Sequence, residues 1–185
     1  HGPELAVVLP GAKDDLVTTI PKRLLGEGST VRDEQLPFDF TIVKYYRNAN
    51  IRRKGPFEPT QATAGAGMSR AVVELPASVG ASGGGEVDTP AAFIELFDKR
   101  NGGKSVGTYL VSVLISSPQR LPIVDEKSGK PYEIAFRFRR EYKPYTIAAK
   151  EVRADHYVAS SRPKNYSSTV RVLDPTRNVD REELI

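Results

Sequence analysis

The stretch PFDFTIVKY, residues 37–45, decides the fold class of this chain. Its side chains Phe38, Phe40 and Ile42 fall at every second position, which is the period of a strand with one buried face. A similar stretch, KPYTIAAKEV at residues 143–152, again places a proline before an aromatic residue, then Thr-Ile and a lysine. Proline is tolerated where a strand begins. We expect a strand in each stretch. Two interpretations stay open: a shared way of starting a strand, or a duplication that gives an internal two-fold repeat.

The rest of the chain repeats the pattern of short apolar runs separated by turns. AAFIELFD and GTYLVSVLIS flank Asn101-Gly102-Gly103, whose glycines supply the positive φ angles of a tight hairpin. LPIVD and YEIAFRFRREY flank EKSGKP, and YTIAAKEVRADHYV and YSSTVRVLD flank ASSRPKN. The sequence therefore predicts an all-β fold, an antiparallel sandwich or partly open barrel of about eight strands.

Proline and glycine set the expected domain organisation. They recur through residues 1–35, where we predict an irregular N-terminal arm that wraps the domain. Residues 36–185 form the predicted β-rich domain. Within it, residues 76–90 are rich in Gly and Ala and predict a flexible loop.

Composition excludes several kinds of chemistry. The 185 residues include no cysteine, which removes thiol catalysis, disulfides and thiolate metal sites. The two histidines are His1 and His156, too few for a histidine metal site. Adjacent carboxylates such as Asp125-Glu126 point apart in an extended chain and form no acid–base pair. We expect no catalytic, cofactor-binding or metal-binding residue, and therefore no enzyme.

The net charge of +4 favours an anionic or acidic partner, with a solvated basic face as the alternative. In FRFRREYKPY, residues 136–145, aromatic and basic residues alternate, as in platforms for single-stranded nucleic acid. Alternation places Phe136 and Phe138 opposite Arg137 and Arg139, which favours a core-facing aromatic pair instead. His156 is interpreted as a structural residue. One of the adjacent Tyr45 and Tyr46 has to face outward, where it could join a protein interface.

The segment 145–182 resembles the soluble domain of the ResB family, proteins of the system II (Ccs) pathway of cytochrome c biogenesis. The resemblance rests on Pro144-Tyr145-Thr146-Ile147, on Asp155-His156-Tyr157, on the basic turn and strand from Arg162 to Val170, and on Val172-Leu173-Asp174 with Arg181-Glu182. It covers about 40 residues, and LPFDFTIVKYY at 36–46 resembles the same opening. The Gly/Ala loop at 76–90 departs from the compact family pattern.

The resemblance implies an extracytoplasmic (periplasmic) domain of an integral membrane protein, of which this chain would be a segment. The whole protein and its ResC/CcsA-type partner subunit would deliver haem to apocytochrome c, so haem is handled by the full complex and this segment has no cofactor of its own. We expect a non-catalytic docking or scaffold role, with apocytochrome c and the partner subunit as partners and no nucleic acid. The alternative is a generic ligand- or nucleic-acid-binding β module.

Overall fold

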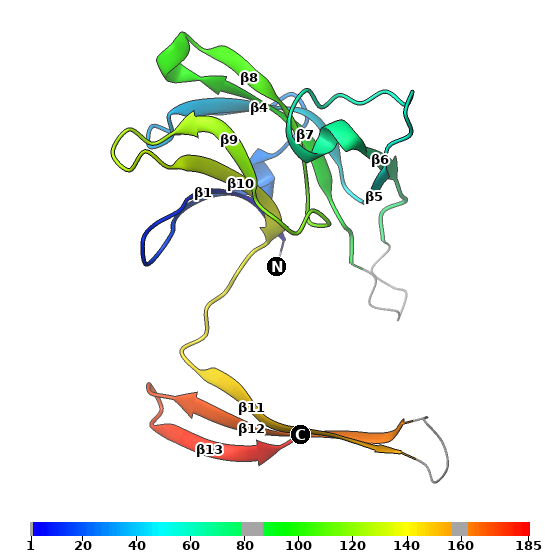
Figure 1. The fold of residues 1–185 in the computed structure, drawn as a ribbon, viewed down its shortest axis with the longest axis vertical. Coiled ribbons are helices and arrows are strands. Elements are labelled where there is room, and N and C mark those ends of the chain that lie inside the picture. Colours follow the sequence, from blue (N-terminus) through cyan, green and yellow to red (C-terminus); the bar gives the residue numbers. More distant parts are fainter. Residues whose placement is uncertain (1, 79–86, 157–162) are drawn as a thin grey trace. The chain divides into compact units, whose positions relative to one another are not determined.

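In the computed structural model, the predicted strand at residues 37–45 is β4 (Phe38–Tyr46), which lies inside a sheet. The structure describes residues 2–78, 87–156 and 163–185. For residues 156, 163 and 164 it describes the backbone only. The chain divides into two units, residues 1–139 and 140–185. Each unit is built from antiparallel sheets, so the predicted all-β fold is confirmed (Figure 1).

Two four-stranded sheets form a sandwich in the first unit, with strand orders β2-β1-β10-β9 and β3-β4-β7-β8. Besides β4 the strands are β1 (Pro3–Leu9), β2 (Leu16–Pro21), β3 (Thr30–Val31), β7 (Ala91–Asp98), β8 (Lys104–Ser112), β9 (Gln119–Val124) and β10 (Pro131–Phe138). Alternate side chains of both sheets, among them Leu5, Phe40 and Ile134, fill one buried core between the sheets. Phe38 of β4 meets Tyr132 of β10 edge to face at 5.8 Å, which links the two sheets.

The other face of the second sheet is covered as well. A two-stranded sheet, β5 (Ala49–Arg53) and β6 (Arg70–Glu74), packs there, and Phe93 and Leu110 form a second small core with Ala49 and Ala62. Three short 3-10 helices complete the unit: η1 (Lys22–Leu24), η2 (Gly65–Ser69) and η3 (Lys99–Asn101). The loop that joins β5 to β6 thereby lies on the sandwich rather than free in solvent.

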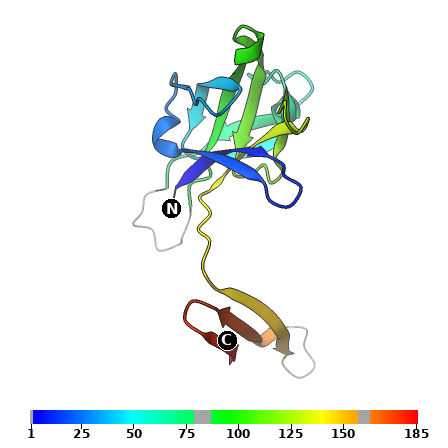
Figure 2. The same ribbon diagram turned by 90° about the vertical axis from the view of Figure 1, so that its left-hand side faces the viewer.

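The second unit is a single three-stranded antiparallel sheet. Its strands are β11 (Thr146–His156), β12 (Pro163–Asp174) and β13 (Val179–Leu184), in the order β11-β12-β13. Figure 2 shows the three strands as one layer. Val170 and Asp174 are buried, whereas most side chains of β11 and β13 are exposed.

The predicted irregular arm at residues 1–35 is wrong. β1 is an inner strand, paired with both β2 and β10, and Leu5 and Val7 belong to the main core. Its continuous apolar run LAVV is typical of a strand with both faces covered, and Pro3 occupies the strand's first residue, where proline is tolerated. The single domain predicted for 36–185 also differs from the structure, which places the boundary between Arg139 and Arg140.

The possible internal two-fold repeat is not found. β4 has neighbouring strands on both sides and buries Phe38, Phe40 and Ile42. β11 is an edge strand; its Ile147 is exposed, and so is Tyr145, the residue before the strand. The two units also differ in their number of sheets. The predicted Gly/Ala loop at 76–90 falls largely on residues 79–86, which lie outside the described residues.

Candidate functional site

A β-bulge gives the second unit one apolar face. Pairing between β11 and β12 shifts at Lys150, between Ala149 and Glu151. Without this extra residue, Ile147 and Val152 would point to opposite faces, because they are an odd number of positions apart. With it, both lie on the same side of the sheet.

Cross-strand partners share a face, so the pairing shows which side chains gather there. Ile147 pairs with Val172, Ala149 with Val170 and Ala154 with Tyr166. Ser168 exchanges backbone hydrogen bonds with Ile185 and pairs with Val152. We call this the apolar face; its members are Ile147, Ala149, Val152, Ala154, Tyr166, Val170, Val172 and Ile185.

Much of the apolar face is open to solvent. The exposed fractions are 59% for Ile147, 71% for Val152, 67% for Tyr166 and 72% for Ile185. Of the charged side chains on this side, Arg181 and Glu183 form an ion pair with each other, and the buried Asp174 lies 3.9 Å from Arg177. The face is therefore nearly neutral and suits an apolar, uncharged surface.

The opposite face of the same sheet is mostly polar, although Leu173 and Leu184 are exposed on it as well. The Arg171 guanidinium donates two hydrogen bonds to Asp180, at 2.6 and 2.5 Å, and Arg153 donates two to Glu151, at 2.8 and 3.1 Å. These hydrogen bonds lower the pKa of both Asp180 and Glu151. Charged side chains are well solvated in water, so the face with more exposed apolar side chains is the one that gains more from a partner.

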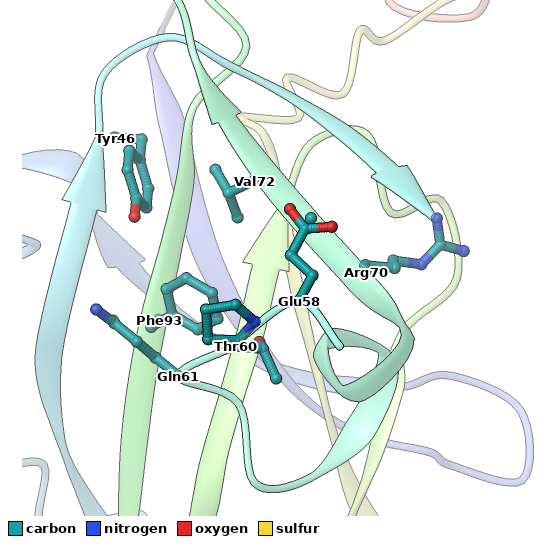
Figure 3. Close-up of a pocket in the computed structure, with 9 residues that line it drawn as sticks. Tyr46, Glu58, Thr60, Gln61, Arg70, Val72 and Phe93 are labelled. Atoms are coloured by element: carbon teal, nitrogen blue, oxygen red, sulfur yellow. The ribbon is translucent and has the colours of Figure 1, made fainter. Parts of the chain in front are cut away.

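A pocket of about 310 Å³ opens on the outer face of the sandwich (Figure 3). The rings of Tyr46 and Phe93 meet edge to face at 6.4 Å and form part of its wall, with Val72 from β6. Glu58 and Arg70 also line it, but Glu58 is bound by Arg52. This pocket can accept a small apolar group, and it contains no paired acid and base within the described residues.

The side chains of Tyr45 and Tyr46 point to opposite faces of β4, as expected for adjacent residues in a strand. A second bulge, at Val43 in β4, directs Tyr45 toward the main core and Tyr46 toward Phe93 on the outer face. Burial raises the pKa of both phenols. The outward tyrosine thus lines the pocket rather than standing free.

The core-facing aromatic pair predicted at Phe136 and Phe138 is found only in part, and Tyr142 and Tyr145 of the same stretch are exposed. Phe136 is buried in the main core, as predicted, but Phe138 at the end of β10 is 42% exposed. Arg137 on the other side donates to Glu4 at 3.1 Å. His156 lies at the last position of β11, and its side chain is outside what the structure describes.

Carboxylates are placed as structural anchors. Asp125 accepts hydrogen bonds from the backbone N–H and the hydroxyl of Ser128 in the β9–β10 turn. Asp174 does the same for Thr176 in the β12–β13 turn. Across the described ranges, no group of three or more His, Asp or Glu is arranged to hold a metal ion.

No helix in the described part of the chain is long and apolar enough to cross a bilayer.

No protein-family profile matches the chain, and no curated protein matches it. The geometry of the apolar face alone identifies it as the candidate site. Sequence reasoning missed it because the bulge at Lys150 hides its alternation, although the isolated Ile147, Val152 and Tyr166 were visible as apolar residues between charges.

Proposed function

We propose that the chain is an extracytoplasmic domain of a ResB-like cytochrome c biogenesis membrane protein, with a non-catalytic docking role in haem delivery to apocytochrome c. The observation that carries the docking role is the exposed apolar face of the β11–β12–β13 sheet. The binding partner would be apocytochrome c or the outer loops of the ResC/CcsA-type subunit. Haem itself would be handled by the full complex.

The segment that resembles the ResB family supports this assignment by its position. Residues 145–182 fall within the second unit, residues 140–185. Its motif Val172-Leu173-Asp174 ends β12, where the buried Asp174 carboxylate closes the turn to β13 through Thr176 and the backbone N–H of Arg177. Most of the described residues that carry the resemblance thus belong to the sheet whose apolar face we propose as the docking surface.

The chemistry of that face fits an unfolded polypeptide. An apocytochrome before haem attachment exposes apolar side chains that the folded protein buries. A neutral apolar sheet face can cover such side chains without selecting for charge. A sheet face that acts by covering apolar side chains of its partner also needs no nucleophile, acid or base.

Binding of a labelled apocytochrome peptide that contains Cys-x-x-Cys-His tests the proposal. Val152→Glu places a charge on the apolar face and should weaken binding at least tenfold, because a buried valine is worth about 1.5 kcal/mol and a charge resists burial. Ala148→Glu is the matched control. It lies on the same strand and pairs with Arg171 on the polar face. Equal effects of the two changes, or no binding by the unsubstituted chain to this peptide or to the partner's outer loops, would end the proposal.

A haem titration followed by Soret absorbance tests whether this domain binds haem itself or leaves haem to the full complex. We expect no saturable shift that depends on His156. If the unsubstituted chain gives a saturable shift that His156→Ala abolishes, this domain binds haem itself, and the docking role proposed here is wrong.

A further inference from the structure

A second exposed feature lies on the first unit, at the start of the loop between β5 and β6. Gly55, Pro56, Phe57 and Glu58 form a turn closed by a hydrogen bond from the Glu58 N–H to the Gly55 carbonyl. Phe57 at its tip is 98% exposed. A single exposed apolar side chain is common on protein surfaces, so the ring marks this site only together with the charges next to it.

The turn is held rigidly by side chains. The Glu58 carboxylate accepts hydrogen bonds from the Arg52 guanidinium and, at 3.1 Å, from the Gly55 N–H. Lys54 Nζ donates to the Glu58 carbonyl at 2.7 Å. The backbone N–H of Lys54 binds the Ser69 carbonyl, which fixes the turn to β6. The backbone of Phe57 is therefore held in place, so little backbone entropy is lost when its ring is covered.

Cationic side chains lie next to this turn. Arg53 and Arg70 are direct cross-strand partners on β5 and β6, and both are exposed. Within the described ranges neither forms an ion pair, whereas Arg52 is neutralised by Glu58. Arg53, Ser69 and Arg70 line a hollow of about 340 Å³. In Figure 3 the Arg70 guanidinium points away from Tyr46 and Phe93. Like charges directly opposite each other destabilise a sheet, and a bound anion would relieve the repulsion.

We propose that the Phe57 turn, with Arg53, Lys54 and Arg70, is a contact site for an anionic lipid surface. The arginines would bind lipid phosphates, and the phenyl ring would enter the region between the headgroups and the acyl chains. A protruding ring favours this partner over an acidic protein, because a lipid surface deforms around it and a protein would need a matching cavity. One ring and three cations give weak, reversible binding. This part of the proposal rests on the proposed function, in which a membrane anchor keeps the domain near the bilayer.

Flotation of the 185-residue chain with vesicles tests the site. The vesicles are phosphatidylcholine alone, or phosphatidylcholine with about 30 mol% phosphatidylglycerol. We expect binding to the anionic vesicles only, falling as salt rises. Arg53→Gln and Arg70→Gln should each lower the partition coefficient about fivefold, and Phe57→Ala about tenfold. The matched controls are Arg177→Gln and Tyr142→Ala, both strongly exposed in the described part of the second unit, and they should change nothing.

Three results would overturn the proposal: no binding to anionic vesicles, binding that survives the Phe57 and arginine changes, or equal losses in the controls. Binding to polyglutamate without binding to vesicles would also overturn it and would indicate an acidic protein partner. The apocytochrome peptide is measured on the same variants. Since the two sites lie on different units, Phe57→Ala should leave peptide binding unchanged, so failure of one proposal can be distinguished from failure of the other.

Discussion

The Thr-Ile pairs at residues 41–42 and 146–147 allow one substitution to be made in two environments. Ile42 of β4 is fully buried, and Ile147 of β11 is 59% exposed. Isoleucine to alanine removes three carbon groups, a transfer loss of about 2.4 kcal/mol. At Ile42 the cavity adds to this loss, so Ile42→Ala should lower the free energy of unfolding by about 3–4 kcal/mol. At Ile147 only about two fifths of the transfer loss applies, or about 1 kcal/mol.

Hydrogen–deuterium exchange read on separate peptides is the suitable assay, because each unit reports its own opening free energy. Exchange in β4 should accelerate more than a hundredfold in Ile42→Ala, and exchange in β11 about fivefold in Ile147→Ala. Val43→Ala, at the exposed bulge of β4, is the control and should have little effect. If Ile147→Ala lowers the opening free energy as much as Ile42→Ala does, the apolar face is covered in solution. The docking proposal would then fail with it.

Three further predictions concern the first unit. Tyr45→Phe should leave the free energy of unfolding unchanged or raise it by up to about 1 kcal/mol in urea denaturation, because the buried hydroxyl has no hydrogen-bond partner in the described structure; a clear loss would reveal one. Gly67→Ala should lower it by about 1–3 kcal/mol, since a Cβ there would lie 2.5 Å from the Ala62 Cβ and 2.6 Å from the Leu110 Cβ; an unchanged urea midpoint would contradict this packing. The hydrogen bond from Arg52, and next that from the Gly55 N–H, lower the pKa of Glu58. The contact therefore stabilises the turn above the unfolded pKa and is lost as pH falls through the folded value. In an NMR titration Arg52→Gln should raise this pKa toward 4.5, and an unchanged value would refute the pairing.

The hairpins were predictable because their signals are local. The turn at Asn101-Gly102-Gly103 joins β7 to β8 through η3, and both glycines have positive φ, at 64° and 71°. The turn before β10 likewise has Gly129 at a φ of 68°. In each case flanking apolar runs and glycine identify the pair without knowledge of the rest of the fold.

The remaining structure depends on contacts between distant residues. β1 pairs with β10 more than a hundred residues later, so the apolar run LAVV after Pro3 does not by itself identify its partner or its place in the sheet. The boundary at Arg139 was missed for a different reason. The stretch RREYKPY is charged and aromatic rather than rich in glycine or serine, and it resembles a continuation of β10. The proposed docking surface was out of reach because a bulge is a property of pairing between two strands and leaves no mark in one strand's sequence.

The two bulges also show how the similar phrases at 37–45 and 143–152 lead to different structural environments. Each strand shifts register shortly after its Thr-Ile pair, at Val43 in β4 and at Lys150 in β11. In β4 the shift lets Tyr45 join the core while Tyr46 lines the outer pocket. In β11 it brings Val152 onto the same face as Ile147. A bulge re-aims the side chains that follow it, so the same local device completes a core where a second sheet is present and leaves an apolar face where, among the described residues, the unit has only one layer.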